Sequence, residues 1–370
     1  MEYFSLKRIL NEKAQYNVIF GERSNGKTFA VQELGIKNYL STKKQMCIIR
    51  RTEVDLTARN GKETFTHFVS NPTRGNLISE WTNNEWNTIE YYSKAWYLAK
   101  IDEKGKVVRD FMPFCYAFAI SIQEHYKSTS YPAVTTILFD EFLTRNIYLQ
   151  DEFILFENLL STIIRDRTDV TIFMCGNTVN KYNPYFKEMG LDQANKMKPG
   201  DIQVYEFAVT NKNETLKVAV QFADSISKKG KASDLYFSFG NPRLKMITHG
   251  MWEIALYPHL PVKYKRNEVI GEFFIIWEDT TLHCEVVQSS ELNSPFIYIH
   301  YKTTPINEQT MPIVFHIDYS AKWNYRRKIN KPSDEIGRRI WYLISNDKVF
   351  YQDNEIGEMV RNYLQWCNIK

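Results

Sequence analysis

The stretch GERSNGKT, Gly21–Thr28, decides the fold of this chain. It fits the pattern of glycine, four arbitrary residues, glycine, lysine and serine or threonine that forms a phosphate-binding loop. Backbone N–H groups of such a loop surround phosphates, Lys27 can reach the β- and γ-phosphates, and Thr28 can ligate Mg²⁺. We therefore predict that ATP with Mg²⁺ binds the loop residues Gly21, Glu22, Arg23, Ser24, Asn25, Gly26, Lys27 and Thr28.

The sequence on either side of this loop favours a nucleotide site over a surface turn that matches the motif by chance. The apolar run 16–20 indicates a buried strand, and residues 27–40 have a helix-forming composition. A strand, a glycine-bearing loop and a helix N-terminus in this order are what an anion site requires.

Three further apolar runs indicate buried strands, and a helix is expected between the last two. The strands are QMCIIR (45–50), VTTILFDEF (134–142) and VTIFMC (170–175), and the helix is EFILFENLLSTIIRDR (152–167). Continuous apolar strands separated by helices predict an α/β fold with a mostly parallel sheet covered on both faces. Residues 88–120 alternate like paired strands around the turn DEKG and predict a hairpin insertion between the second and third strands.

Two adjacent acids end the third predicted strand. Asp140 is a candidate for holding Mg²⁺ through a coordinated water, and Glu141 for orienting and deprotonating the attacking water. Asn177, just past the fourth strand, is a candidate sensor of the γ-phosphate. The alternative for Asp140 and Glu141 is a strand that simply ends in two solvated acids. The alternative for Asn177 is an ordinary polar loop residue.

Phosphoryl transfer also uses an additional cation, which a neighbouring subunit often supplies. Arg165 and Arg167 at the end of the predicted helix are candidates, and so is Lys127 in the loop before the third strand. Each could equally be a solvated surface charge.

Composition limits the remaining classes. The length of 370 residues suggests two domains, and a net charge of +4 allows a nucleic-acid partner only through local basic clusters. Secretion and membrane spanning are not expected, because the N-terminus has no signal-peptide pattern and no apolar run reaches about 18 residues. The five cysteines are scattered without a C-x-x-C pair, so we expect reduced thiols and neither a disulfide frame nor a cysteine zinc site: Cys47, Cys115, Cys175, Cys284 and Cys367.

A change of composition near residue 196 suggests the domain boundaries. We predict an ATPase domain at 1–197, a linker or lid region at 198–233 and a smaller α+β domain at 234–370. The last domain should hold strands at 250–257, 272–279, 282–288, 296–301 and 312–319, followed by helices starting near Ser333 and Gly357.

Five segments together resemble a known family: GERSNGKT, IIRRTEVDL (48–56), YPAVTTILFDEF (131–142), IIRDR (163–167) and GNTVNKYNPYF (176–186). In this order they resemble the DNA encapsidation ATPases of small tailed phages with protein-primed linear genomes, over about the first 190 residues. The resemblance implies an additional-strand, catalytic-glutamate ATPase. It also implies a homopentameric ring at the portal vertex of an empty capsid, in the host cytoplasm, threading double-stranded DNA inward. The docking partner would be the portal (connector) or an RNA adaptor.

By position in these motifs, Arg165 matches the trans-acting arginine of the family, and Lys127 a basic residue in the loop before the Walker B strand. Glu53 departs from the resemblance, because a basic residue would suit a DNA-facing loop; Arg59, Lys62 and Arg74 are nearby replacements.

For the C-terminal domain the resemblance implies a ribonuclease H-type fold that has lost its catalytic acids. Basic clusters there suit a nucleic-acid backbone, or are solvated faces: Lys228, Lys229, Lys231, Lys322, Arg326, Arg327, Lys328, Arg338 and Arg339. The acids near predicted strands or helix starts are Glu272, Glu278, Asp279, Glu285, Asp318, Asp334 and Glu335. Asp318 is the hardest of these to dismiss as a nuclease ligand.

The leading hypothesis is therefore a packaging motor that couples ATP hydrolysis to DNA translocation. The alternatives are a terminase-like motor with an active nuclease, a helicase, and a capsid-vertex protein that binds ATP without turnover. The chain has one phosphate-loop motif, which disfavours a helicase, and the intact Asp140 and Glu141 disfavour a retired site.

Overall fold

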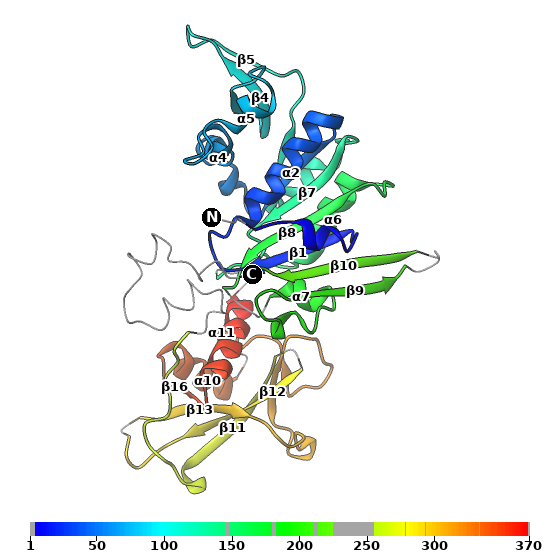
Figure 1. Ribbon diagram of the computed structural model, residues 1–370. Coiled ribbons are helices and arrows are strands. Elements are labelled where there is room, and N and C mark those ends of the chain that lie inside the picture. The colour runs from blue at the N-terminus through cyan, green and yellow to red at the C-terminus, as the bar shows by residue number, and fades with distance from the viewer. Residues whose placement is uncertain are drawn as a thin grey trace. The chain divides into compact units, whose positions relative to one another are not determined.

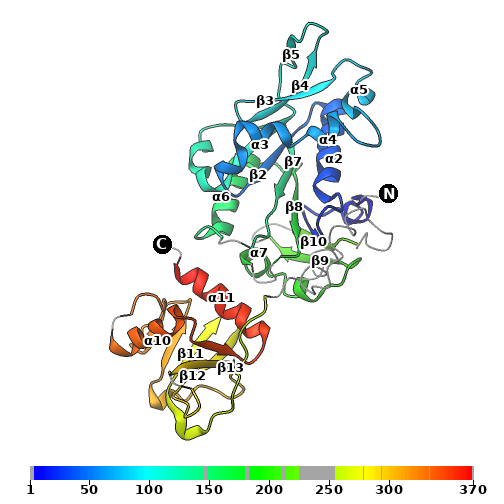
Figure 2. The ribbon, with the colours of Figure 1, turned by 90° about the vertical axis from the view of Figure 1, so that its left-hand side faces the viewer.

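The computed structural model describes residues 4–145, 148–179, 183–209, 214–224, 255–277, 279–292, 294–332 and 334–368 (Figures 1 and 2). The chain divides into two compact units, Met1–Trp252 and Glu253–Lys370. Among the described helices, none combines the length and the apolar composition needed to cross a bilayer.

The first unit is built on a ten-stranded sheet in the described part of the chain. Its order is β3-β4-β6-β2-β7-β8-β1-β10-β9, with β5 beside β4. Strands β6, β2, β7, β8, β1 and β10 pair in parallel, and β4 and β9 add antiparallel edges. The predicted α/β fold with a mostly parallel sheet is confirmed. The strands are β1 (Tyr16–Gly21), β2 (Gln45–Arg50), β3 (Thr88–Tyr92), β4 (Ala95–Ile101), β5 (Val107–Arg109), β6 (Cys115–Ala119), β7 (Val134–Asp140), β8 (Thr171–Asn177), β9 (Ile202–Ala208) and β10 (Thr215–Phe222).

The position of β8 fixes where the motifs meet. It lies between β1 and β7, with Asn177 opposite Gly21 and Cys175 opposite Asp140. The C-terminal ends of three neighbouring parallel strands therefore bring the loop, Asn177 and the two acids to one edge of the sheet. An extra strand between the loop-bearing and acid-bearing strands is the arrangement that the family resemblance implies.

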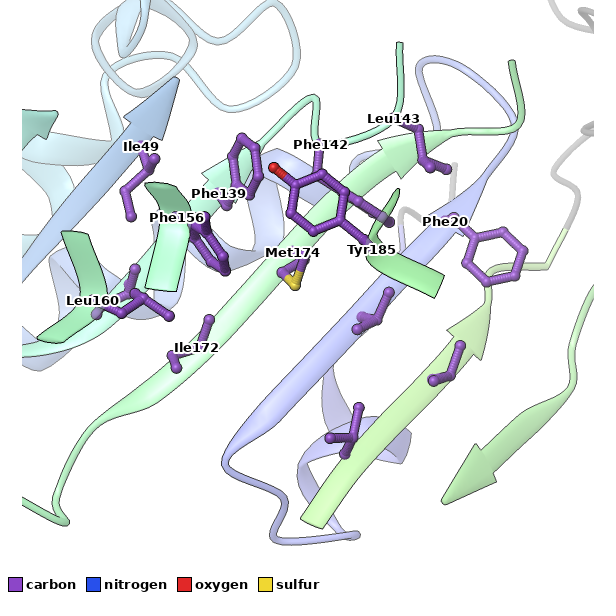
Figure 3. Close-up of a cluster of buried hydrophobic side chains, with 14 of the residues drawn as sticks. Phe20, Ile49, Phe139, Phe142, Leu143, Phe156, Leu160, Ile172, Met174 and Tyr185 are labelled. Atoms are coloured by element: carbon purple, nitrogen blue, oxygen red, sulfur yellow. The ribbon is translucent and has the colours of Figure 1, made fainter. Parts of the chain in front are cut away.

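Helices cover both faces of this sheet because alternate strand residues point to opposite sides. Ile48 belongs to the buried cluster that includes Val31 and Ile36 of α2 (Lys27–Thr42). Ile49 belongs to the other cluster, which includes Phe156 of α6 (Glu152–Ile164). Figure 3 shows this second cluster, where the rings of Phe139, Phe142, Phe156 and Tyr185 gather. The shorter helices are α1 (Lys7–Leu10), α3 (Ala58–Glu63), α4 (Thr66–Val69), α5 (Leu77–Trp81) and α7 (Pro184–Glu188), with 3-10 turns η1 (Glu53–Leu56), η2 (Ile120–Tyr126) and η3 (Ala194–Lys196).

The predicted hairpin insertion is present between β2 and β7. Strands β3 and β4 form its hairpin, β5 pairs with the end of β4, and the predicted DEKG turn falls between β4 and β5. The last strand of the segment, β6, joins β2 in parallel and so extends the main sheet.

The first sheet continues past the predicted boundary at residue 197. Residues 202–208 and 215–222, predicted as part of a linker, are β9 and β10, and β10 pairs in parallel with β1. Val218 and Val220 are buried on one face of β10 and Ala219 on the other, which makes this a core strand. Residues 225–254, including Lys228, Lys229 and Lys231 and most of the predicted strand 250–257, lie outside the described residues.

The second unit holds a six-stranded sheet in its described residues, ordered β15-β14-β11-β12-β13-β16. Strands β11, β12 and β13 form an antiparallel meander, and β14 and β15 continue in parallel beside β11. This mixed sheet agrees with the α+β domain that we predict for the C-terminal residues. The elements are η5 (Arg266–Glu268), β11 (Val269–Trp277), β12 (Thr280–Val287), β13 (Phe296–Tyr301), η6 (Glu308–Thr310), β14 (Ile313–His316), β15 (Tyr325–Arg326), α10 (Glu335–Ser345), β16 (Val349–Tyr351) and α11 (Asn354–Asn368).

Candidate functional site

A pocket of about 290 Å³ lies at the C-terminal ends of β1, β7 and β8. Its lining includes loop residues 23–28 together with Asp140, Glu141 and Asn177, so the structure brings these predicted site residues together. The other lining residues are Phe29, Gln32, Arg50, Thr64, His67, Cys175 and Gly176. Gly21 ends β1 immediately before the loop, and the buried Glu22 contributes its backbone carbonyl, as described below.

The loop ends at a helix N-terminus that suits an anion. Gly26 precedes α2 in the left-handed region with φ +92°, a conformation that costs glycine little and most other residues more. Glycine has no side chain with which to cap the first turn of the helix. Lys27, Thr28 and Phe29 of the first turn line the pocket, so the positive end of the helix dipole lies beside it and favours a phosphate group there.

Lys27 lies at the centre of this loop and is almost completely buried. Its Nζ donates to the carbonyl oxygen of Glu22 at 2.7 Å, to Asn25 Oδ1 at 3.1 Å and to Asn177 Oδ1 at 3.4 Å. The buried Asn25 Nδ2, by contrast, has no hydrogen-bond partner among the described residues. An unsatisfied buried donor costs about 1–3 kcal/mol, so acceptor oxygens of a phosphate fit this pocket.

The two acids at the end of β7 lie in different environments. Asp140 is buried, and its Oδ1 accepts a hydrogen bond from Thr28 Oγ1 at 2.7 Å. Glu141 follows at φ +60°, and its side chain is 65% exposed. The hydroxyl and buried carboxylate form an oxygen-donor pair that suits Mg²⁺, whereas the exposed Glu141 is accessible to water.

Arg50, at the end of β2, binds both acids and was not singled out by the sequence. Its Nη2 lies 2.8 Å from Asp140 Oδ2, and its Nη1 lies 3.1 Å from Glu141 Oε2. The register of β2 and β7, with Ile49 opposite Phe139, places the arginine beside Asp140. The sequence shows an arginine directly after an apolar strand, which could have marked Arg50 as a candidate. Only the strand order of the folded sheet reveals that this strand is the neighbour of β7.

We predict that Arg50→Ala lowers the free energy of unfolding by about 1–3 kcal/mol in EDTA, because the buried Asp140 loses a charged partner. The loss should shrink when Mg²⁺ and ATP are added, since a bound divalent cation then compensates the same carboxylate. Urea denaturation under both conditions measures this. Arg74→Ala is the control, because Arg74 pairs with the exposed Glu80 away from the pocket. An equal loss in both conditions would contradict the assignment.

The next residue, Arg51, fixes the turn that carries Glu141. Its Nη1 and Nη2 donate to the carbonyl oxygens of Glu141 at 3.3 Å and Phe142 at 2.8 Å, and its Nε donates to Glu152. Glu152 is fully buried and also accepts from the Tyr185 hydroxyl at 2.6 Å. Burial and the Glu152 charge raise the pKa of Tyr185 well above its usual value, so the hydroxyl remains a donor. Arg51 and Tyr185 are further residues that sequence reasoning did not find.

The three candidate trans-acting cations lie away from the pocket. Arg165 follows α6 at the N-terminal edge of the sheet, about 20 Å from the pocket edge by the length of seven-residue β7, and donates to the carbonyl oxygen of Thr129 at 3.1 Å. Lys127 is exposed and pairs with Glu124. Arg167 instead donates to several backbone carbonyls, including Val134 at 2.7 Å, and serves the fold. Arg165 accordingly does not line the pocket of this chain.

Two of the charged residues in and near the loop predicted to face DNA form ion pairs within the chain. Glu53, the departure from the resemblance, pairs with Lys94. Arg59 and Lys62 lie on α3, and Arg74 pairs with Glu80 at 3.4 Å.

Among the described residues of the second unit, no three of the predicted acids converge. The carboxylate of Asp318 is 79% exposed and lies 3.9 Å from His316 Nδ1. Glu272 and Glu285 both pair with Arg266, and Asp334 caps α10. Glu278 lies outside the described residues. Among the described residues, the one group whose ligand atoms cluster is His283, Glu285 and His300, which is not a carboxylate triad.

The predicted basic clusters of this unit are largely paired. Arg326 binds Asp334, Arg339 binds Glu335 and Lys322 binds Glu308. Arg327 and Lys328 both lie over the ring of Trp366, each 5.4 Å from its centroid.

The chain is similar to known phage packaging proteins. The profile of the family described as Podovirus DNA encapsidation protein (Gp16) matches residues 99–237. The DNA packaging protein of Bacillus phage B103 is 27% identical over 185 residues, 47% of this chain and 48% of that protein. That of Bacillus phage phi29 is 25% identical over 187 residues, 50% of this chain and 49% of that protein. The chain thus spans about half the length of the curated relatives it matches.

Two solved structures share the fold. The phi-28 gp11 DNA packaging motor aligns with a TM-score of 0.53 at 17% identity, covering 100% of this chain and 98% of that one. The phi-29 viral genome packaging motor assembly aligns with a TM-score of 0.51 at 18% identity, covering 97% and 96%. The predicted resemblance to the DNA encapsidation proteins of podoviruses is thereby confirmed, in sequence over part of the chain and in fold over nearly all of it.

Proposed function

We propose that this chain is an ATPase whose hydrolysis drives double-stranded DNA into a preformed phage capsid. The observation that carries the proposal is the contact of Thr28 with Asp140 beside the buried Lys27, with Glu141 one residue beyond. This combination supplies a phosphate cradle, an oxygen-donor pair and an exposed carboxylate in one pocket. The similarity to phage DNA packaging proteins points to DNA as the material moved.

The pocket residues divide into binding and catalytic roles. The loop donors and Lys27 hold the phosphates, and Thr28 with Asp140 would hold Mg²⁺, which neutralises phosphate charge when bound. Glu141 orients the attacking water and accepts its proton. Asn177, whose Oδ1 already contacts Lys27 Nζ at 3.4 Å, senses the γ-phosphate end of the pocket.

A second subunit completes the site. Arg165 lies at the opposite sheet edge from its own pocket, which supports a role in the pocket of a neighbour, and Lys127 lies in the loop that precedes the same edge. We propose a homopentameric ring on the portal (connector) of the procapsid, docked directly or through an RNA adaptor, in the host cytoplasm. The second unit guides DNA or docks the motor without cutting, because no three of its described carboxylates gather as a two-metal nuclease site requires.

The test is ATP hydrolysis by the purified chain with and without linear double-stranded DNA. A packaging motor should hydrolyse ATP several-fold faster with DNA, and the DNA should stay at full length in Mg²⁺. Lys27→Ala, assayed in parallel, corrects for contaminating ATPases. Silence in both conditions would identify a structural ATP-binding protein, whereas shortened DNA that Asp318→Ala protects would identify a motor with an active nuclease.

A further inference from the structure

We propose that the second unit carries a zinc site formed by His283, Glu285 and His300. His283 and Glu285 are two residues apart on β12 and so share one face, and His300 is paired directly opposite His283 on β13. One ring nitrogen of each histidine and one oxygen of Glu285 all lie within 4.8 Å of one another. Two imidazoles and a carboxylate are a donor set that zinc takes in proteins.

Each imidazole has one nitrogen held by an outer partner. His300 Nδ1 lies 2.9 Å from the carbonyl oxygen of Tyr301, which can only accept, so Nδ1 carries the proton and Nε2 keeps its lone pair. That Nε2 lies 3.5 Å from Glu285 Oε2. His283 Nε2 lies 3.2 Å from Glu272 Oε2, which likewise leaves Nδ1 unprotonated in the neutral ring. Metal-binding histidines are oriented by such carbonyl and carboxylate partners.

The third ligand is oriented in the same way. Glu285 is buried; the Tyr264 hydroxyl donates to its Oε2, and Arg266 Nη1 donates to its Oε1 at 2.8 Å. Arg266 also pairs with Glu272 and is 72% exposed. Two carboxylates and one guanidinium leave a formal charge of −1 around the neutral imidazoles, which favours a bound cation.

Packing fixes both rings before a metal binds. The His283 ring stacks on Phe274 with centroids 4.9 Å apart, and the His300 ring stacks on Tyr298 at 5.5 Å. Both ligand-bearing strands lie inside the sheet, so little ordering is left for binding. Three protein ligands leave one position of a tetrahedral zinc ion for water or another donor. The cluster lies in the second unit and takes no part in the proposed ATPase site.

The experiment is calorimetric titration of the full-length, chelator-treated chain with Zn²⁺, with thermal unfolding followed in parallel. We expect one zinc ion per chain and a higher Tm with zinc. Separate His300→Gln and Glu285→Gln variants should each bind at least about tenfold more weakly, since even losing an outer partner typically costs 10- to 100-fold. His316→Gln is the matched control, because His316 lies on β14 of the same sheet outside the cluster.

The circular dichroism spectra of the zinc-free variants should match that of the wild-type chain, which shows that the substitutions leave the fold intact and that the zinc affinities can be compared. Co²⁺ substitution of the wild-type chain tests the site without any mutation: an intense visible band indicates tetrahedral coordination. Absence of stoichiometric zinc binding, unchanged affinity in both cluster variants, or only the weak band of octahedral Co²⁺ would each overturn the proposal.

Discussion

Glu141→Gln should bind ATP with nearly native affinity and lose about 10²–10⁴-fold in the rate of hydrolysis, the contribution typical of a general base. The Glu141 side chain is exposed at the pocket, whereas the buried contacts of the phosphate cradle are made by other residues. The exchange removes the proton acceptor, keeps the shape and leaves the cradle intact. The effect should therefore fall on the transition state and spare the ground state.

The variant Lys27→Ala should show the opposite pattern, in which ATP binding itself is weakened. A hydrogen bond to a charged group is worth about 1.5–3 kcal/mol, so nucleotide affinity should fall roughly 10- to 100-fold. Binding of a fluorescent ATP analogue and single-turnover hydrolysis separate the two effects. If both variants lose binding to the same extent, the division of roles between the loop and Glu141 is wrong.

Arg165→Ala should abolish hydrolysis in a ring composed of that variant alone, because a trans-acting arginine contributes about 10³–10⁵-fold. Its guanidinium donates to the carbonyl oxygen of Thr129, which precedes β7 at the sheet edge opposite the pocket, and this position fits the proposed role in a neighbour's pocket. Mixing with Glu141→Gln subunits should restore part of the activity. At some interfaces, an intact arginine from one variant then meets an intact catalytic site from the other.

Exchange of fluorescently labelled subunits shows whether mixed rings form. Arg109→Ala, which removes an exposed arginine from the insertion, is the control and should hydrolyse ATP normally without mixing. Mixed rings with no recovered activity would exclude the trans role. If Arg165→Ala subunits hydrolyse ATP without mixing, then Lys127 or another cation can supply the trans-acting charge.

The core of the candidate site was predictable because its residues are fixed by local spacing. The phosphate loop and the pair Asp140–Glu141 each follow an apolar run, and a parallel sheet brings the ends of such strands to one edge. Arg50 and Arg51 were not predictable in the same way. Their partners lie on β7 and α6, and nothing in the linear order shows that β2 is the neighbour of β7.

Two other features depended on pairing that the sequence does not reveal. Strand β9 is largely exposed at the sheet edge, and the sequence on either side of β10 is rich in polar residues. The amino-acid composition of residues 198–233 therefore resembled that of a linker. His283 and His300 are seventeen positions apart and become neighbours only through the register of β12 and β13. In the second unit, the antiparallel strands and both helices were nevertheless identifiable from their apolar runs.

In the proposed ring, the buried contact of Arg51 with Glu152 would link the nucleotide site of one subunit to that of the next. Glu152 begins α6, and Arg51 joins it to the carbonyl oxygen of Glu141. The other end of this continuous 13-residue helix, about 20 Å away, leads into Arg165. One continuous helix thus connects the turn that carries Glu141 to Arg165, the cation that we propose acts in the adjacent pocket. In the proposed ring, a displacement of the Glu141 turn would move Arg165 through α6, which would give the order of hydrolysis a physical basis within each subunit.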